Sequence, residues 1–269
     1  MSCTKILQPV DLTFLTWSLS RSSTGTAGSF LKSYEETNGK KYYYKMSNYD
    51  SVRGVIGHES VNEIVAQNIA DALQIEHLNY ELVYCTVKVA DKMLQTWVTR
   101  SEDFKNPGES KMTFETYYEI LRLDGEDKFQ FIERMGLKEY FNNLFLLDYI
   151  ICNRDRHGAN IEVLQTGDTY RLAPLFDNGL SFLFSCYNDG KQMLEFDKLK
   201  DGPVNNYVGS MNLSDNLKLV PKTLRQKVTM PSRAQLFQGL ENAKEAVPEE
   251  YWDCIYDMVK ERINYVKNI

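Results

Sequence analysis

The chain has 269 residues, 43% of them hydrophobic and 12% aromatic, which is enough apolar material to bury a large core in one domain or in two packed lobes. Its formal net charge of −6 argues against a protein that binds nucleic acid directly by neutralising phosphates, because such proteins carry an excess of Lys and Arg. No run of about eighteen apolar residues occurs, and the N-terminus lacks the apolar core of a signal peptide, so we expect no membrane association.

A segment rich in small residues comes first, at positions 20–29 (Ser-Arg-Ser-Ser-Thr-Gly-Thr-Ala-Gly-Ser). Small side chains let backbone N–H groups approach phosphate oxygens, so Gly25, Thr26 and Gly28 are candidate contacts to the phosphates of a ligand. The segment is neither a Walker A sequence nor a complete Gly-x-Gly-x-x-Gly pattern, and by itself a plain flexible loop is the commoner explanation. Its position before a strand that ends near Lys45 favours a phosphate-binding loop.

Three β-prone runs dominate the first hundred residues, at positions 41–46, 80–87 and 93–98. Between the first two runs a helical pattern begins behind Gly57 and His58. Its apolar residues recur at the spacing of one helix face: Val61, Ile64, Val65, Ile69 and Ala72. Strands with one helix predict a small α+β lobe.

The apolar period changes after a loop at positions 105–108, and mostly helices are predicted from there on. Residues 137–151 are apolar almost all round, which favours a buried helix at the centre of a second lobe. Residues 161–172 have the pattern of a short β-hairpin with Gly167 in its turn.

The most informative polar residues lie directly after this helix and directly after this hairpin. They are residues 153–160 (Asn-Arg-Asp-Arg-His-Gly-Ala-Asn) and residues 173–179 (Ala-Pro-Leu-Phe-Asp-Asn-Gly). Rigid elements hold such groups while loops expose them, which is typical of catalytic residues. Phosphoryl transfer needs a group that orients the attacking hydroxyl, and oxygen ligands for the Mg²⁺ that neutralises phosphate charge.

The spacing of these groups matches that of protein kinases. Asp155 and Asn160 stand five residues apart, as do the catalytic Asp and the metal-binding Asn of the protein-kinase catalytic loop. Asp177 lies in an Asp-Asn-Gly turn where protein kinases have Asp-Phe-Gly. The pattern predicts Asp155 as the catalytic base and Asn160 with Asp177 as ligands of Mg²⁺. Each piece alone is more often an ordinary turn or a chance spacing, but their combination with a buried helix and a hairpin favours catalysis.

Two neighbours of Asp155 have other interpretations. Arg156 either neutralises a nearby carboxylate or phosphate, or is an ordinary solvated arginine. His157 has no second His or Cys that would complete a zinc site, so we interpret it as a packing and hydrogen-bonding residue that shapes the loop.

The order of helix, Asn-Arg-Asp-Arg-His-Gly-Ala-Asn, hairpin and Ala-Pro-Leu-Phe-Asp-Asn-Gly-Leu-Ser resembles the HipA-like serine/threonine kinase family. That family's pattern is roughly Asn-x-Asp-Arg-His-x-x-Asn followed by a Pro-x-Phe/Tyr-Asp element. The resemblance is specific over residues 140–185 and looser from residue 20 onward. Phosphoinositide kinases share the Asp-Arg-His-x-x-Asn order, so this motif alone indicates the superfamily and not the substrate.

The resemblance also implies ATP-binding residues in the first lobe. Lys45 stands where such kinases carry the lysine that contacts the α- and β-phosphates of ATP. Glu63 is the expected carboxylate that positions this lysine, although Glu59 and Glu63 are also explained as ordinary solvated charges on one helix face. Trp97 and Val98 lie in a stretch that resembles the hinge between lobes, where backbone groups would bind adenine.

Some members of this family autophosphorylate a serine in the Gly-rich loop, which ejects the loop and switches the enzyme off. The resemblance therefore implies Ser22, Ser23 and Thr24 as autophosphorylation candidates, where a phosphate would add about two negative charges beside those of ATP. Toxin members of the family are longer at the N-terminus and pair with a DNA-binding antitoxin. The resemblance here is to a compact or split version, for which toxin status and an antitoxin or partner subunit are open expectations.

These observations predict an α+β, bilobal, protein-kinase-like fold, with a small strand-rich N-lobe over residues 1–99 and a larger helical C-lobe over residues 100–269. We expect an ATP- and Mg²⁺-dependent kinase of HipA-like type that acts on Ser or Thr of a protein substrate. The alternatives are a lipid or small-molecule kinase, and a nucleotide-binding pseudokinase that serves as an interaction module. Five cysteines at irregular spacing are typical of reduced thiols, so a cytoplasmic location is expected, with unconventional secretion left open.

Overall fold

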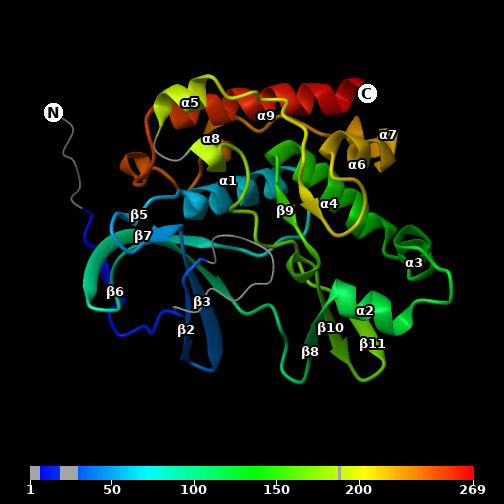
Figure 1. Ribbon diagram of the computed structural model, residues 1–269, viewed down its shortest axis with the longest axis horizontal. Coiled ribbons are helices and arrows are strands. Elements are labelled where there is room, and N and C mark those ends of the chain that lie inside the picture. Colours follow the sequence, from blue (N-terminus) through cyan, green and yellow to red (C-terminus); the bar gives the residue numbers. More distant parts are fainter. Residues whose placement is uncertain (1–6, 19–29, 187–188) are drawn as a thin grey trace.

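The computed structural model describes residues 7–18, 30–186 and 189–269 of the chain. These residues form two lobes with separate hydrophobic cores, a smaller lobe built on a five-stranded sheet and a larger one that is mostly helical (Figure 1). The predicted bilobal α+β architecture is therefore confirmed.

The sheet of the smaller lobe has the strand order β1-β6-β7-β3-β2. Its strands are β1 (Val10–Asp11), β2 (Lys32–Thr37), β3 (Lys40–Met46), β6 (Glu81–Val89) and β7 (Lys92–Glu102). Neighbouring strands are antiparallel, except that β1 is parallel to β6. The turn between β2 and β3 is Asn38-Gly39, both at positive φ, which is the two-residue turn whose twist suits an antiparallel hairpin. A separate small hairpin is formed by β4 (Tyr49–Asp50) and β5 (Gly54–Val55).

Side chains alternate between the two faces of β3, and this alternation places Lys45. Tyr44 and Met46 point into the core of the smaller lobe, where Met46 is completely buried. Lys45 lies between them in sequence, so its side chain points to the opposite face, toward the helix α1 (Glu59–Ala72). Lys45 is the single charge in residues 42–46, and it lies on the face of the strand that points away from this core.

The helix α1 follows the first strands in sequence but packs into the core of the larger lobe. Its apolar residues Val61, Val65 and Ile69 share that core with residues of α4 (Lys138–Ile151) and α9 (Glu250–Asn268). Figure 1 shows α1 lying between the sheet of the smaller lobe and the helices at the opposite side of the molecule. Burial of this apolar face fixes α1, and every side chain on it, relative to the larger lobe.

The larger lobe contains a three-stranded antiparallel sheet and the remaining helices. The sheet has the order β11-β10-β8, with β8 (Ser110–Thr113), β10 (Glu162–Thr166) and β11 (Thr169–Leu172). A two-residue parallel pair joins β9 (Asp155–Arg156) to β12 (Asn205–Asn206). The other helices are α2 (Phe114–Leu121), α3 (Lys128–Arg134), α5 (Gly190–Leu194), α6 (Leu213–Leu219), α7 (Lys222–Arg225) and α8 (Arg233–Leu236).

Helix α4 lies at the centre of the larger core, as its composition predicted. Leu144, Leu146 and Leu147 are at most 2% exposed and lie on different sides of the helix. Among the buried positions of this helix the one charged residue is Asp148, which is also only 2% exposed. A carboxylate buried in a hydrophobic core needs a partner for its charge. The partner of Asp148 is Arg156, whose other contacts are described with the candidate site below.

Two further sequence expectations can be compared with the structure. The predicted hairpin is present as β10 and β11, with Gly167 at a positive φ of 56° in its turn. The predicted lobe boundary at residues 99 and 100 falls inside β7, which runs on to Glu102, and it stays a prediction.

Within the described parts of the chain, none of the helices combines the length and apolar character needed to cross a bilayer.

His58, directly before α1, gives the fold a pH dependence. Its side chain is 2% exposed and lies edge-on to the ring of Tyr251, with 5.2 Å between ring centroids. Burial lowers the pKa of His58 from the usual 6.5 to about 4. Between these two values the unfolded chain binds a proton that the folded protein does not, so stability is lost as the pH falls through this window.

We predict that His58→Gln, which cannot take up this proton, reduces the acid-side loss of stability. Between pH 7 and pH 5, the free energy of unfolding of the wild type should fall by roughly 2 kcal/mol more than that of the variant. Urea unfolding at the two pH values measures this difference. Burial also lowers the pKa of His77, but this residue is present in both proteins and cancels in the comparison. An equal loss in both proteins would contradict the prediction.

Candidate active site

The segment that carries Asp155 begins where α4 ends. Cys152 terminates the helix in the left-handed conformation, with a φ of 54°, and turns the chain back along the lobe. Asn153 is fully buried and accepts a hydrogen bond from the backbone N–H of Asp155 (3.1 Å) while it donates to Oδ1 of Asp148 (3.0 Å). The buried helix thereby fixes the backbone of Asp155 at its exit.

Arg156 connects the three segments that form the site. Its side chain is 1% exposed, and its guanidinium forms a two-pronged ion pair with Asp148 of α4 (Nη2 to Oδ1 2.8 Å, Nε to Oδ2 3.0 Å). It also donates to the carbonyl oxygens of Asn160 (3.3 Å) and Phe176 (2.6 Å) and to Oδ1 of Asn178 (2.6 Å). Of the two interpretations of Arg156, the structure supports neutralisation of a carboxylate and excludes a solvated side chain.

The two predicted metal ligands, Asn160 and Asp177, are each fixed by a hydrogen bond that involves the backbone. Nδ2 of Asn160 donates to the carbonyl oxygen of Asp155 (2.8 Å), which leaves Oδ1 as the acceptor of that amide. Asp177 has a φ of 59°, an uncommon conformation for a residue with a Cβ, and its N–H donates to the hydroxyl oxygen of Tyr80 (3.2 Å). Such a conformation persists only where the surrounding structure determines it from several sides.

The turn that follows Asp177 packs closely against α1. The N–H of Asn178 donates to Oε2 of Glu63 (2.8 Å). A Cβ on Gly179 would lie 3.0 Å from Cβ of Glu59, closer than most such contacts, so a glycine suits the close approach of the turn to the helix. The glycine of the Asp-Asn-Gly sequence is therefore explained by its contact with α1.

Asn62, next to Glu63 on α1, holds the same turn to the C-terminal helix. Its Nδ2 donates to the carbonyl oxygens of Gly179 (2.8 Å) and Ser181 (3.0 Å). Its Oδ1 accepts a hydrogen bond from the hydroxyl of Tyr251 in α9 (2.8 Å). The side chain is fully buried, so these bonds satisfy an amide that has no access to water.

Lys45 reaches this turn from the smaller lobe. Its Nζ lies 3.2 Å from Oε1 of Glu63 and forms a second ion pair with Oδ1 of Asp177. The expected pairing of Lys45 with Glu63 is thus present, whereas the carboxylate of Glu59 accepts a hydrogen bond from the backbone N–H of Asn48 (3.0 Å). One cation from β3 bridges two carboxylates of separate segments.

Lys32 adds positive charge on the same side of the site. It stands opposite Lys45 in the register of β2 and β3, and directly paired residues of two strands share one face. Its charge also acts on Asp177, whose pKa it helps to lower. The cluster therefore has local cations although the chain as a whole is negative.

The two carboxyl groups of the site have opposite shifts in pKa. Burial opposes ionisation of Asp177, but the ammonium of Lys45 holds the pKa of this carboxyl well below its usual range. In Asp155, burial and the negative charge of Asp177 raise the pKa, against the opposing effects of His157 and Asn205. A carboxylate that stays ionised suits a cation ligand, and one with raised proton affinity suits a base. Arg156, next to Asp155 in sequence, donates to the carbonyl oxygen of Phe176, next to Asp177, and this bond brings the two groups to one region.

The carboxylate of Asp155 has contacts that the motif did not predict. Asn205 of β12 donates from Nδ2 to Oδ1 of Asp155 (2.8 Å), and Nε2 of His157 lies 3.7 Å from Oδ2. Nδ1 of His157 accepts a hydrogen bond from the N–H of Ala159 (3.1 Å), in agreement with a residue that shapes the loop. Asn205 is 50 positions from Asp155 in sequence, and no spacing rule links them.

The predicted hinge at Trp97 and Val98 is wrong. Both residues lie inside β7, and Val98 is paired with β6 on one side and with β3 on the other. Its side chain is fully buried in the core of the smaller lobe, and its backbone lies between two paired strands, so it is not in a free hinge segment that could bind adenine through the backbone. The strand continues through four polar residues to Glu102, and residues 103–109 then lead to β8 of the larger lobe. Because the last residues of β7 are polar, the sequence does not indicate that the strand continues to Glu102.

The predictions for the Gly-rich loop at positions 20–29 cannot be compared with the structure. Gly25, Thr26 and Gly28, predicted to contact ATP, and Ser22, Ser23 and Thr24, predicted as autophosphorylation sites, lie outside the described residues. Their roles stay predictions from the sequence.

The oxygen ligands suit a cation that arrives together with phosphates. In the described part of the chain, no group of three or more His, Cys, Asp or Glu side chains is arranged to hold a metal ion. Mg²⁺ often takes only one or two carboxylates and completes its shell with waters and substrate phosphates. Asp177 and Oδ1 of Asn160 are donors of this kind, and they fit Mg²⁺ bound with a nucleotide better than a closed metal cage.

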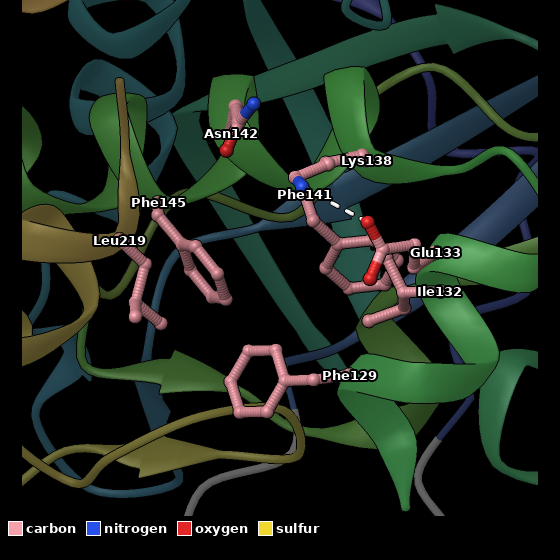
Figure 2. A pocket seen from close by; sticks show the side chains of 8 residues that line it. All are labelled: Phe129, Ile132, Glu133, Lys138, Phe141, Asn142, Phe145 and Leu219. Carbon is pink, nitrogen blue, oxygen red and sulfur yellow. Dashed lines mark hydrogen bonds and ion pairs between the residues drawn. The ribbon is translucent and has the colours of Figure 1, made fainter. Parts of the chain in front are cut away.

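A hollow of about 320 Å³ lies elsewhere in the larger lobe, between α3, α4 and the end of α6 (Figure 2). Its lining is mainly apolar and consists of Phe129, Ile132, Glu133, Lys138, Phe141, Asn142, Phe145 and Leu219. Its two charged residues face each other, with Nζ of Lys138 3.3 Å from Oε1 of Glu133. Because none of the residues around Asp155 and Asp177 lines this hollow, we place the candidate chemistry at the polar cluster instead.

Comparison with solved structures identifies the fold. The chain is similar to a Helicobacter pylori proinflammatory kinase, CtkA, with a TM-score of 0.63 and 16% sequence identity, and the match covers 97% of each chain. The predicted protein-kinase-like fold is therefore confirmed.

A weaker structural match is to HipA of Shewanella oneidensis MR-1, from a complex of HipA, HipB and operator DNA of a toxin–antitoxin system. Its TM-score is 0.45 at 14% identity, and it covers 93% of this chain and 68% of that one. No family model matches the sequence, and no curated protein does.

We predict that Arg156→Ala strongly destabilises the protein, because it leaves the carboxylate of Asp148 buried without its partner. Breaking a buried pair in this way typically costs about 3–5 kcal/mol, and urea unfolding measures the loss. Arg154→Ala is the matched control, since the guanidinium of Arg154 lies against the rings of Phe184 and Phe196, 5.4 and 5.7 Å from their centroids. Loss of those contacts should cost only about 1 kcal/mol. Similar losses in the two variants would refute this assignment.

Proposed function

We propose that this protein is an ATP- and Mg²⁺-dependent kinase of HipA-like type that phosphorylates Ser or Thr of a protein. The observation that supports the proposal is the convergence of four distant segments on one cluster. Lys45 of β3 pairs with Glu63 of α1 and with Asp177, and Arg156, beside Asp155, donates to the carbonyl oxygen of Phe176, beside Asp177. The kinase-like fold is compatible with this activity, but the argument depends on the side chains, because one fold hosts many functions.

The nucleotide would be bound from both lobes. Lys45, held by Glu63, would contact the α- and β-phosphates, and Lys32 on the same face would add a second cation. Asp177 and Asn160 would hold Mg²⁺, which neutralises charge on the phosphates when it is bound. The lowered pKa of Asp177 keeps this ligand ionised at neutral pH.

The acceptor would be activated by Asp155. Its carboxylate would orient the hydroxyl and take its proton while the hydroxyl oxygen bonds to the γ-phosphorus and the bond from that phosphorus to the departing ADP breaks. Oδ1 of Asp155 already accepts a hydrogen bond from Asn205, so Oδ2 is the oxygen left to receive the proton.

Two alternative functions assign a different role to the cluster of Lys45, Asp155, Asn160 and Asp177. A pseudokinase that serves only as an interaction module has no need for Lys45, Asp155, Asn160 and Asp177 to converge, which favours the enzyme. A lipid or small-molecule kinase would use the same chemistry on another acceptor. The family resemblance also predicts an antitoxin or partner subunit and a cytoplasmic location, and both stay predictions.

We predict that the purified protein, incubated with γ-labelled ATP and Mg²⁺, transfers label to itself or to a protein substrate. Asp155→Ala should lower kcat by about 10²–10⁴-fold, because it removes the base. Asp177→Ala should remove the dependence of nucleotide binding on Mg²⁺. Asp215→Ala is the control: this carboxylate is exposed on α6, where it pairs with Lys218, and its loss should leave transfer unchanged.

Each other outcome separates the alternatives. Binding of ATP without transfer by the wild type would support the pseudokinase, and label on added lipids or small molecules alone would point to another acceptor. Equal labelling by the wild type and Asp155→Ala would contradict the assigned base.

Autophosphorylation has its own test. Intact mass measurement after incubation with ATP should show added phosphate on the wild-type chain but not on Asp155→Ala, and peptide mapping should locate it at Ser22, Ser23 or Thr24. An unchanged mass would count against autophosphorylation without affecting transfer to other substrates.

A further inference from the structure

We infer that Asn205 is a positioning residue, which turns the carboxylate of Asp155 so that Oδ2 meets the incoming hydroxyl. The inference rests on the proposed kinase function. Asn205 lies outside every motif that predicted the site, and the structure brings it there through β12.

The contact itself distinguishes the two oxygens of Asp155. Nδ2 of Asn205 donates to Oδ1 at 2.8 Å, a normal hydrogen-bond length. Nε2 of His157 lies 3.7 Å from Oδ2, which is too long for a hydrogen bond. A carboxylate turns easily about its last bond, because that torsion has no sharp energy wells. The bond to Asn205 selects one of the orientations that would otherwise be accessible.

The backbone attaches β12 to β9 without help from this side chain. The N–H of Asn205 donates to the carbonyl oxygen of Arg154 (2.9 Å), and the N–H of Tyr207 donates to that of Arg156 (3.0 Å). These bonds set the register that places Asn205 opposite Asp155. Since the strand is already held, the side-chain bond adds orientation of the carboxylate and not attachment of the strand.

The segment that carries Asn205 is itself held firmly. The N–H of Val204 donates to the carbonyl oxygen of Met211 (2.9 Å), which closes the loop on the far side of β12. Upstream, Arg262 of α9 is fully buried and donates from Nε to the carbonyl oxygen of Lys198 (2.8 Å) and from Nη2 to that of Lys200. A group that orients a catalytic residue must be fixed by its own support, and this framework supplies it.

The chemistry of the amide also suits this role. Asn205 is exposed, so water could satisfy its Nδ2, and burial does not force the bond to Asp155. A lysine or arginine at this position would form an ion pair with the carboxylate and weaken it as a base. A neutral amide orients the carboxylate without adding a charge.

The test compares two neighbouring asparagines of β12 in the full-length protein. Asn205→Ala should lower kcat for phosphoryl transfer by roughly 10–100-fold, because a misdirected base reacts slowly, while the KM for ATP stays the same. Asn205→Asp keeps the shape but removes the donor, and should lower kcat at least as much. Asn206→Ala is the matched control, since Nδ2 of Asn206 donates to the carbonyl oxygen of Ser210 (3.1 Å) and not to Asp155.

The supporting result is a loss of kcat in both Asn205 variants, with wild-type KM for ATP, wild-type unfolding midpoints and normal kinetics of Asn206→Ala. Wild-type kcat in Asn205→Ala or in Asn205→Asp would overturn the inference, as would an equal loss in Asn206→Ala, which would assign β12 a structural role only. If the wild type transfers no phosphoryl group at all, the proposed function has failed and this inference with it.

Discussion

Arg156 and Asp148 meet inside the larger lobe, and the candidate site is assembled around their ion pair. Asp148 is the one charged residue among the buried positions of α4, where an unpaired carboxylate would be costly. Arg156 removes this cost, and its remaining N–H groups donate to Asn160, Phe176 and Asn178. Because arginine has five donors in one rigid plane, a single side chain fixes α4, the loop after Asp155 and the turn after Asp177 relative to one another.

The position of α1 extends this constraint to the smaller lobe. Its apolar face belongs to the core of the larger lobe, and Asn62 bonds it to the turn at Gly179 and to Tyr251 of α9. Glu63 therefore has a fixed position relative to Asp177, and it receives Lys45 from the sheet. Through these contacts the core of the larger lobe fixes the positions of Glu63 and Asp177. These are the two carboxylates with which Lys45 of the smaller lobe pairs.

The balance of charge in the cluster explains its chemistry. Glu63, Asp177 and Asp155 bring three carboxyl groups together, and Lys45 alone neutralises two of them directly. Burial makes each ionised carboxylate more costly, which raises the pKa of Glu63 and of Asp155, whereas Lys45 keeps Asp177 ionised. A site with unneutralised carboxylate oxygens beside cations of β2 and β3 suits a ligand that carries both a metal ion and phosphates.

The sequence by itself determined the local elements and the spacing of the chemistry. The aromatic run with Lys45, the apolar helix before Asp155 and the five-residue step to Asn160 are local patterns, and local periodicity predicts local structure. Tertiary packing alone decided which distant groups meet: Lys45 with Asp177 across 132 positions, Asn178 with Glu63 across 115, and Asn205 with Asp155 across 50. It also placed Val98 inside a strand, because pairing with β3 and β6 continues through polar residues that the sequence does not mark as strand. Such contacts depend on how buried faces fit together in three dimensions, which spacing along the chain does not encode.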